Sequence, residues 1–166
     1  MNGYVMALRL IFLVTLWLPI GCNSGPTPPD NLPTLHPVKL KLLQDGMPLA
    51  DASVRLVPNG ERSSWYSGGT TDADGIVAIK THGQFLGAPE GSYRVTISKI
   101  EMPEAATSTL EDLNKKASQG STFDLVDPKF GNPAKTTLRL EVAAESNEQE
   151  FDLGPAVRTP RKGPPG

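Results

Sequence analysis

The sequence of 166 residues has few of the side chains from which most catalytic and metal sites are built. It contains one cysteine and two histidines, so a single copy cannot form a disulfide framework or a Cys/His zinc site. It also has no basic block long enough to follow a phosphate backbone, and 16 basic against 18 acidic residues give a net charge of -2. These absences exclude most catalytic templates, predict no cofactor and argue against nucleic acid as a partner.

The N-terminal 21 residues carry a hydrophobic run. One cation, Arg9, precedes an apolar stretch over residues 10–18. This stretch is too short to cross a bilayer, which takes about 20 residues, but it fits the core of a secretory signal, which takes about 7 to 15. We therefore expect residues 1–21 to be a signal peptide and the chain to be exported.

The single cysteine, Cys22, follows this run directly, after the small residue Gly21. The segment Leu18-Pro19-Ile20-Gly21-Cys22 resembles the lipobox of bacterial lipoproteins, although Pro19 stands where that family usually has leucine. The resemblance implies cleavage before Cys22 and acylation of the thiol and of the new N-terminus. Two or more acyl chains hold a protein stably on a membrane, so the protein would face the periplasm or the cell surface. The alternative is an unmodified thiol behind an ordinary signal peptide or an uncleaved anchor.

Composition divides the rest of the chain into three parts. Residues 22–37 contain five prolines and no apolar period, which is typical of an extended stalk. Residues 38–153 are the expected folded domain. Their insertion at 101–134 is longer than usual loops and is therefore either a binding element or disordered. Residues 154–166 are rich in glycine, proline and cations and predict a disordered tail.

Within the domain, apolar and polar residues alternate over short segments bounded by turn residues. The clearest are Val38-Lys39-Leu40-Lys41-Leu42 and Tyr93-Arg94-Val95-Thr96-Ile97, and this period of two is typical of strands with one buried face. Further strands are expected at residues 53–56, 64–67, 76–79, 138–142 and 150–153. About seven short strands with hardly any helix predict an all-β fold, an antiparallel sandwich of two sheets.

Four motifs occur in a characteristic order along this domain. They are Asp45-Gly46 with Pro48-Leu49, Asp51-Ala52 with Val54, Thr71-Asp72-Ala73-Asp74-Gly75, and Pro89-Glu90-Gly91-Ser92-Tyr93-Arg94-Val95. Together they resemble the carboxypeptidase regulatory-like domain, which implies a transthyretin-like sandwich related in form to immunoglobulin domains. Val126-Asp127-Pro128-Lys129-Phe130-Gly131-Asn132-Pro133 and Phe151-Asp152-Leu153 resemble the ending of small lipoproteins of planctomycete-type bacteria. The family's name does not imply peptidase activity, because the domain is an accessory beside a catalytic one.

Asp72, Asp74 and Gly75 resemble the start of a calcium loop. No third ligand or distal bidentate glutamate follows at the required spacing. The favoured interpretation is a hairpin turn in which an aspartate accepts backbone hydrogen bonds and the glycine takes a positive φ. Asp72 and Asp74 are thus weak metal candidates.

Trp65 and Tyr66 are adjacent, so on a strand their side chains would point to opposite faces and one of them would lie outside the core. An exposed aromatic ring can stack on a sugar or grip a peptide; the alternative is a rim residue covered by the insertion. Of the two histidines, His36 is expected in the stalk edge and His82 as a solvated residue of a loop.

These observations favour an exported, lipid-anchored β-sandwich that acts as a binding or structural module of the cell envelope, without catalysis. Its expected partners are the membrane, through Cys22, and an envelope protein or glycan. One alternative is a small periplasmic carbohydrate- or peptide-binding protein. A second, with less support, is a metal-dependent hydrolase using Asp72, Asp74 or His82.

Overall fold

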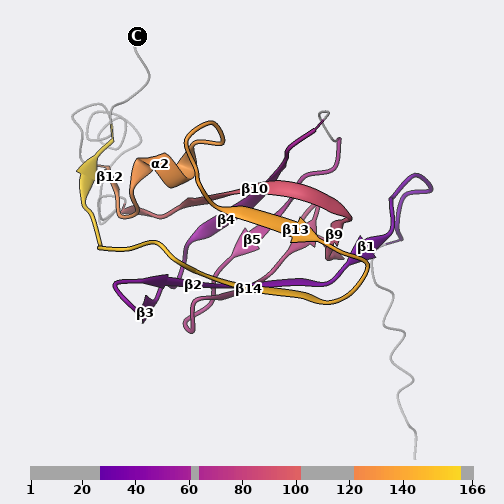
Figure 1. The fold of residues 1–166 in the computed structure, drawn as a ribbon, viewed down its shortest axis with the longest axis horizontal. Coiled ribbons are helices and arrows are strands. Elements are labelled where there is room, and N and C mark those ends of the chain that lie inside the picture. Colours follow the sequence, from indigo (N-terminus) through magenta and orange to yellow (C-terminus); the bar gives the residue numbers. More distant parts are fainter. Residues whose placement is uncertain (1–26, 61–63, 102–121, 162–166) are drawn as a thin grey trace, which may run out of the picture.

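Alternating apolar side chains build two β-sheets that face each other, as the computed structural model shows (Figure 1). The model describes residues 27–60, 64–101 and 122–161. The predicted all-β fold is confirmed. The predicted signal peptide, Cys22, the beginning of the predicted stalk and residues 102–121 of the predicted insertion lie outside the described residues.

Sheet I is centred on β2, which has β14 on one side and β3 and β6 on the other. Its strands are β2 (Val38–Gln44), β3 (Met47–Pro48), β6 (Ile76–Ala78) and β14 (Asn147–Asp152). Sheet II has the strand order β13-β10-β4-β5-β7-β8. Its strands are β4 (Ser53–Pro58), β5 (Ser67–Thr70), β7 (Lys80–Thr81), β8 (Phe85–Leu86), β10 (Gly91–Ser98) and β13 (Arg139–Val142).

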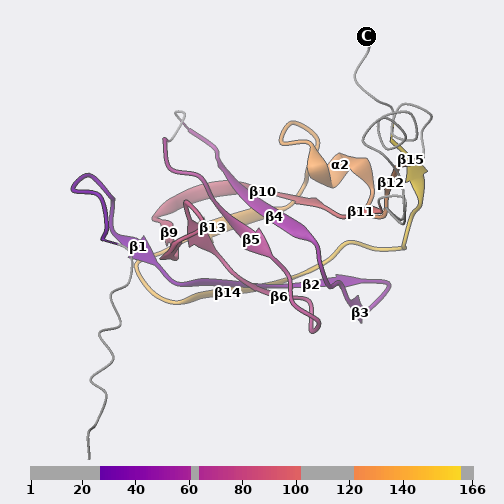
Figure 2. The same cartoon turned by 180° about the vertical axis from the view of Figure 1, so that it is seen from behind.

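Two smaller groups of strands lie at opposite ends of the sandwich (Figures 1 and 2). At one end, β1 (Leu35–His36) pairs with β9 (Ala88–Pro89). At the other end, β11 (Ile100–Glu101), β12 (Phe123–Asp124) and β15 (Thr159–Pro160) form a three-stranded sheet next to the short helix α2 (Pro128–Gly131).

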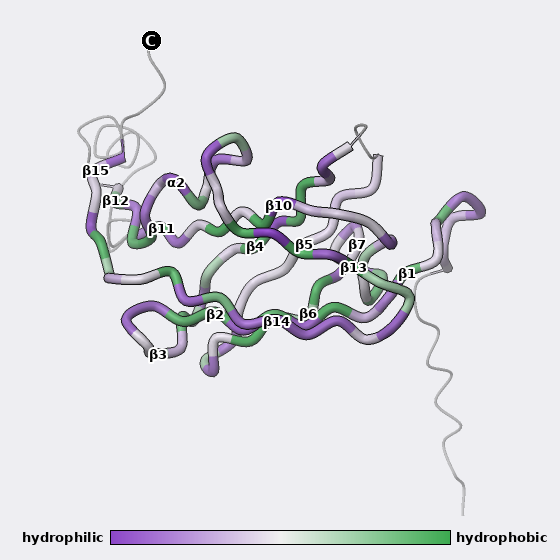
Figure 3. Tube along the Cα trace, viewed as in Figure 1, coloured by the Kyte–Doolittle hydropathy of each residue, from purple (hydrophilic) through white to green (hydrophobic). Residues whose placement is uncertain are grey.

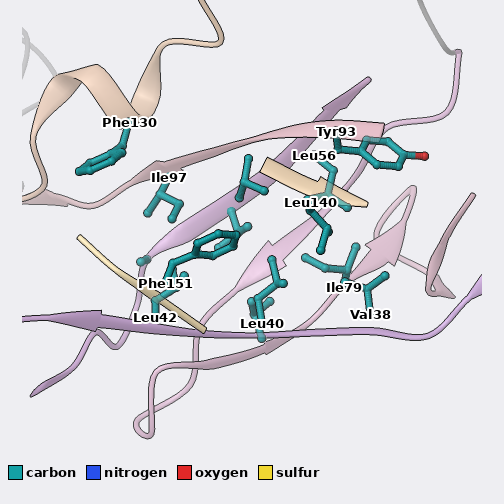
Figure 4. Close-up of a cluster of buried hydrophobic side chains, with 14 of the residues drawn as sticks. Val38, Leu40, Leu42, Leu56, Ile79, Tyr93, Ile97, Phe130, Leu140 and Phe151 are labelled. Atoms are coloured by element: carbon teal, nitrogen blue, oxygen red, sulfur yellow. The ribbon is translucent and has the colours of Figure 1, made fainter. Parts of the chain in front are cut away.

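The core lies between sheets I and II (Figure 4). Leu40 and Leu42 of β2 are fully buried and point toward sheet II. Val95 and Ile97 of β10 are the buried residues that sheet II contributes to the same core. The hydropathy of the chain changes from residue to residue along these strands, so that one face of each strand is apolar (Figure 3). Each such side chain contributes about 1.5 to 3 kcal/mol on burial, which makes this interleaved layer the main source of stability.

The pairing of β14 differs from the purely antiparallel sandwich that the sequence predicted. β14 runs parallel to β2, the one parallel pair among the strands that the structure describes. After β13 the chain crosses from sheet II to sheet I, so β14 is not tied to β2 by a hairpin that would force an antiparallel direction. The register places Glu148 beside Lys39 and Glu150 beside Lys41, with ion pairs of 3.6 Å and 2.8 Å.

The predicted strand at 76–79 corresponds to β6 in sheet I, and the chain passes to sheet II directly after it. Residues up to Ala78 pair with β2 in sheet I, whereas Lys80 and Thr81 pair with β5 in sheet II. The chain crosses the core at Ile79, whose side chain is fully buried. One continuous segment therefore links the two layers.

The predicted stalk and the predicted disordered tail extend too far, because both contain residues that form paired strands. Leu35 and His36 of the stalk form β1, and Thr159 and Pro160 of the supposedly disordered tail pair with β12 of the insertion. The tail is held further by an ion pair of 2.9 Å between Arg158 and Glu101. A strand of two residues is too short to show an alternating pattern in the sequence. It forms only because it pairs with a segment that is distant in the chain.

Helix α2 begins at an N-cap aspartate. The Asp127 carboxylate accepts a hydrogen bond of 2.9 Å from the Lys129 backbone N–H, and this bond is the main cause that lowers the pKa of Asp127. Phe130 is buried beneath the helix. This anchoring holds α2 against β10.

Candidate functional site

The outer face of sheet II, the face turned away from the core, carries an open groove of about 490 Å³. Strands β4, β5, β7 and β10 form its floor, Gly131 of α2 lies at one end, and Tyr66 and Gly83 lie at the other. From Tyr66 to Thr70 the groove follows five residues of extended chain, whose four steps span about 13 Å. A groove of this length takes a ligand larger than a single small ion.

The strand register brings four groove residues into one row across the sheet. Thr96 of β10 is opposite Arg55 of β4, Arg55 is opposite Gly68 of β5, and Gly68 is opposite Lys80 of β7. Arg55 and Lys80 therefore lie two strands apart, about 10 Å between their Cα atoms. Gly68 has no side chain, and a Cβ at this position would collide with the Val54 carbonyl oxygen. The surface between the two cations is therefore formed by backbone without a side chain.

Arg55 and Lys80 give this groove a positive charge that no acidic residue in the described part of the chain neutralises. The described residues that line the groove include no aspartate or glutamate. Both cations are exposed, and no hydrogen bond or ion pair joins the guanidinium or the ammonium group to the described part of the chain. A negatively charged ligand would meet two free cations here.

The outer face of sheet I is different in this respect. Its cations Lys39 and Lys41 each pair with a glutamate of β14, and the hollow that they line measures about 250 Å³. Charges on this face are balanced within the protein. The outer face of sheet II therefore carries positive charge that no described acidic residue pairs with, whereas the lysines on the outer face of sheet I are paired.

A second row of the groove is made of hydroxyl groups. Ser98 of β10 is opposite Ser53 of β4, and Ser53 is opposite Thr70 of β5. Hydroxyl groups both donate and accept hydrogen bonds. This row lies between the cationic row and α2, so a ligand along the groove would meet charge and hydroxyl groups in succession.

Tyr66, predicted as a ligand contact together with Trp65, lies at the open end of the groove. The predicted strand over 64–67 is wrong in extent, because β5 begins at Ser67, and the two rings do not point to opposite faces of a sheet. Both lie against the His82 ring instead, with centroid distances of 4.8 Å for Trp65 and 4.7 Å for Tyr66.

His82 fixes this aromatic cluster from the loop after β7. Its backbone has a φ of 52° and donates a hydrogen bond of 3.0 Å to the Tyr66 carbonyl. Its ring Nε2 lies 3.2 Å from the Ser64 carbonyl. The imidazole is partly covered, in contrast to the solvated residue that the sequence predicted. The ring of Tyr66, 56% exposed, is thus held in place while remaining open to solvent.

The Asp72–Gly75 segment is the hairpin turn that we favoured over a calcium loop. The Asp72 carboxylate oxygen Oδ1 accepts hydrogen bonds of 3.0 Å and 2.8 Å from the backbone N–H groups of Asp74 and Ile76. Gly75 has a φ of 73°. Within residues 27–60, 64–101 and 122–161, no three side chains of His, Cys, Asp or Glu lie together in a way that could hold a metal ion. His36 lies in β1, away from both features.

Arg55, Gly68 and Lys80 are groove residues that the sequence analysis missed. Arg55 and Lys80 each look like an ordinary solvent-facing residue of a strand, and only the register brings them together. The pair Gly68-Gly69 is the signal that could have been used, because glycine inside a strand often marks a close approach of another backbone or a ligand.

Comparison with known proteins gives no relative: no protein-family model and no curated protein matches the chain. The resemblance to the carboxypeptidase regulatory-like domain therefore stays a prediction. In the described residues, no helix has the length and apolar character needed to span a membrane.

Proposed function

We propose that this protein is an exported, lipid-anchored β-sandwich that acts as a binding module of the cell envelope and has no catalytic activity of its own. The observation that carries the proposal is the groove on sheet II, where Arg55 and Lys80 lie in one row without an acidic partner among the described residues. Two like charges held near each other are unfavourable until an opposite charge joins them. Such an arrangement suits binding.

The side chains of the groove support binding over chemistry. Within residues 27–60, 64–101 and 122–161, its lining consists of hydroxyl, glycine and apolar residues with Arg55, Lys80 and Tyr66, and contains no carboxylate, imidazole or thiol. Carboxylates and imidazoles are the most frequent general bases, and a hydroxyl nucleophile such as serine needs a base of this kind beside it. Asp72, the carboxylate considered for a hydrolase, is engaged in its own turn.

The proposed anchor rests on the sequence around Cys22. A hydrophobic run, a small residue and the chain's only cysteine follow one another there, and acyl chains on that cysteine would hold the protein on the membrane. In the described structure the chain enters the sandwich at β1, at the end opposite α2 and β12 (Figures 1 and 2). An anchored protein would therefore be attached to the membrane at this end, and the outer faces of both sheets would stay accessible.

The anchor is tested by the intact mass of the protein from the membrane fraction of its host. The expected mass is that of a chain beginning at Cys22 with added acyl chains, and the Cys22→Ala variant should leave the membrane fraction. A wild-type chain that begins at Cys22 without acyl groups, or one that fractionates with the soluble proteins, would overturn the anchor.

A further inference from the structure

We infer that the groove on sheet II binds an acidic polysaccharide, with the carboxylate groups of uronic-acid sugars between Arg55 and Lys80 and a sugar ring against Tyr66. The inference rests on the proposed function, because it names the class of ligand for that binding module. It is argued from the charge, the hydroxyl row, the exposed ring and the length of the groove.

Charge selects an anion at the cationic row. Arginine and lysine are donors only, and their hydrogen bonds to a carboxylate are stronger than those between neutral groups. Among the residues that the structure describes, Arg55 and Lys80 are the only cations that line the groove. They lie on either side of Gly68, and the floor between them is bare backbone. One carboxylate can approach both from above the glycine.

Length and hydroxyl groups select a chain of sugars over a lone anion. The hydroxyls of Ser53, Thr70 and Ser98 continue the groove from the cationic row toward α2. They can exchange hydrogen bonds in either direction with the hydroxyls of a sugar. An inorganic anion would occupy the cationic row and leave this part of the groove empty.

The exposed ring of Tyr66 completes the site at the other end. Aromatic rings combine a flat apolar face with low conformational entropy, and Tyr66 is held in advance by the His82 ring and by the backbone hydrogen bond to its carbonyl. A sugar ring presents an apolar C–H face to such a surface. Tyr66 is therefore a stacking residue and His82 positions it.

A peptide suits the groove less well. Extended peptides gain most of their binding from the unpaired backbone of an edge strand. The groove lies over β4, which is paired with β10 and β5, and over β5, which is paired with β4 along its length and with β7 at Ser67 and Gly68. A peptide lying there would find little unpaired backbone.

The test is a calorimetric titration of the full chain, purified as the cell processes it, with an oligogalacturonate. A neutral gluco-oligosaccharide of the same length, inorganic phosphate and a pentaglutamate peptide serve as comparison ligands. Wild-type protein should bind the oligogalacturonate most tightly. Equal or tighter binding of the neutral sugar, of phosphate or of the peptide would overturn the inference, as would failure to bind the oligogalacturonate.

Variants then assign the site. The Arg55→Gln/Lys80→Gln protein should bind at least about tenfold more weakly, whereas Lys39→Gln/Lys41→Gln, which removes two positive charges from the opposite face, should change the affinity by less than about twofold. Tyr66→Ala should weaken oligogalacturonate binding. Equal losses in the two double variants would mean general electrostatic attraction and would overturn the assignment.

Thermal unfolding of each variant shows whether it is folded. All substituted side chains are exposed, so each variant is expected to fold. Failure of this inference can be distinguished from failure of the proposed anchor. A protein that has the acylated mass but does not bind the oligogalacturonate would refute the ligand class alone. A protein without acyl chains would refute the anchor, whichever ligand it binds.

Discussion

Thr71 is a buried polar residue that ties the end of β5 to the segment before β4. Its hydroxyl donates a hydrogen bond of 2.6 Å to the Leu49 carbonyl and accepts one of 2.9 Å from the Ala52 backbone N–H. The side chain is only 2% exposed, so water cannot replace these bonds. This connection also sets the positions of Ser53 and Thr70 in the groove.

Replacing Thr71 by valine keeps the shape of the side chain and removes the hydroxyl. The Leu49 carbonyl loses one of its bonds, and the Ala52 N–H is left buried without this acceptor. A hydrogen bond contributes about 1 kcal/mol net, and an unsatisfied buried group costs about 1 to 3 kcal/mol. We therefore expect Thr71→Val to lower the free energy of unfolding by about 2 to 4 kcal/mol.

Urea unfolding followed by circular dichroism measures this change, with the slope m expected to stay constant. Thr70→Val is the matched control, since the neighbouring Thr70 is exposed and its substitution should change the stability by no more than about 0.5 kcal/mol. Thr71→Ser keeps the hydroxyl and should recover most of the loss. If Thr71→Val lost less than about 1 kcal/mol at an unchanged m, the reasoning from buried hydrogen bonds would be refuted.

Two further predictions concern the end of the sandwich and the turns. The hydrogen bonds from Arg158 are the main cause that lowers the pKa of Glu101 below its ordinary value of 4.5; their stabilisation is therefore present above that value and lost as the pH falls through the lowered pKa. Hydrogen-exchange protection of β12, relative to β4, should decrease in acid for the wild type and decrease less in Arg158→Gln, which keeps the ion pair between Arg161 and Asp124 of β12; identical pH profiles would contradict this. Gly75 and Gly46 have similar φ angles of 73° and 72°. A Cβ at Gly75 would lie 2.5 Å from the Leu42 carbonyl oxygen, whereas a Cβ at Gly46 would meet open space. Gly75→Ala should therefore lower the stability measured by thermal unfolding clearly more than Gly46→Ala. Equal losses would show that strain in φ alone accounts for the effect, about 1 to 3 kcal/mol.

The strands of the core could be predicted from the sequence because their side chains alternate. Val38, Leu40 and Leu42 are buried while Lys39 and Lys41 are exposed, as their period of two predicts. The turn at Asp72 could also be predicted, since its aspartate and glycine act within a few residues of each other. Local patterns thus indicated local structure correctly.

What depends on distant partners could not be predicted. The parallel direction of β14 and the pairing of Thr159 with Asp124 are set by contacts between segments far apart in the chain. The groove has the same origin, because Arg55 and Lys80 become neighbours only through the registers on both sides of Gly68. The residues of such a site can be read from a single sequence, but which of them lie side by side cannot.

The central claim is that the outer face of sheet II is the binding surface of an envelope-anchored protein. A photo-crosslinking amino acid placed at Ser53, in the groove, and in a second strain at Lys39, on the outer face of sheet I, tests this claim in living cells. We predict covalent adducts of the membrane-bound protein from the Ser53 position, lost on adding Arg55→Gln/Lys80→Gln, and none above background from the Lys39 position. Adducts of equal yield from the two faces, or from Lys39 alone, would contradict the account.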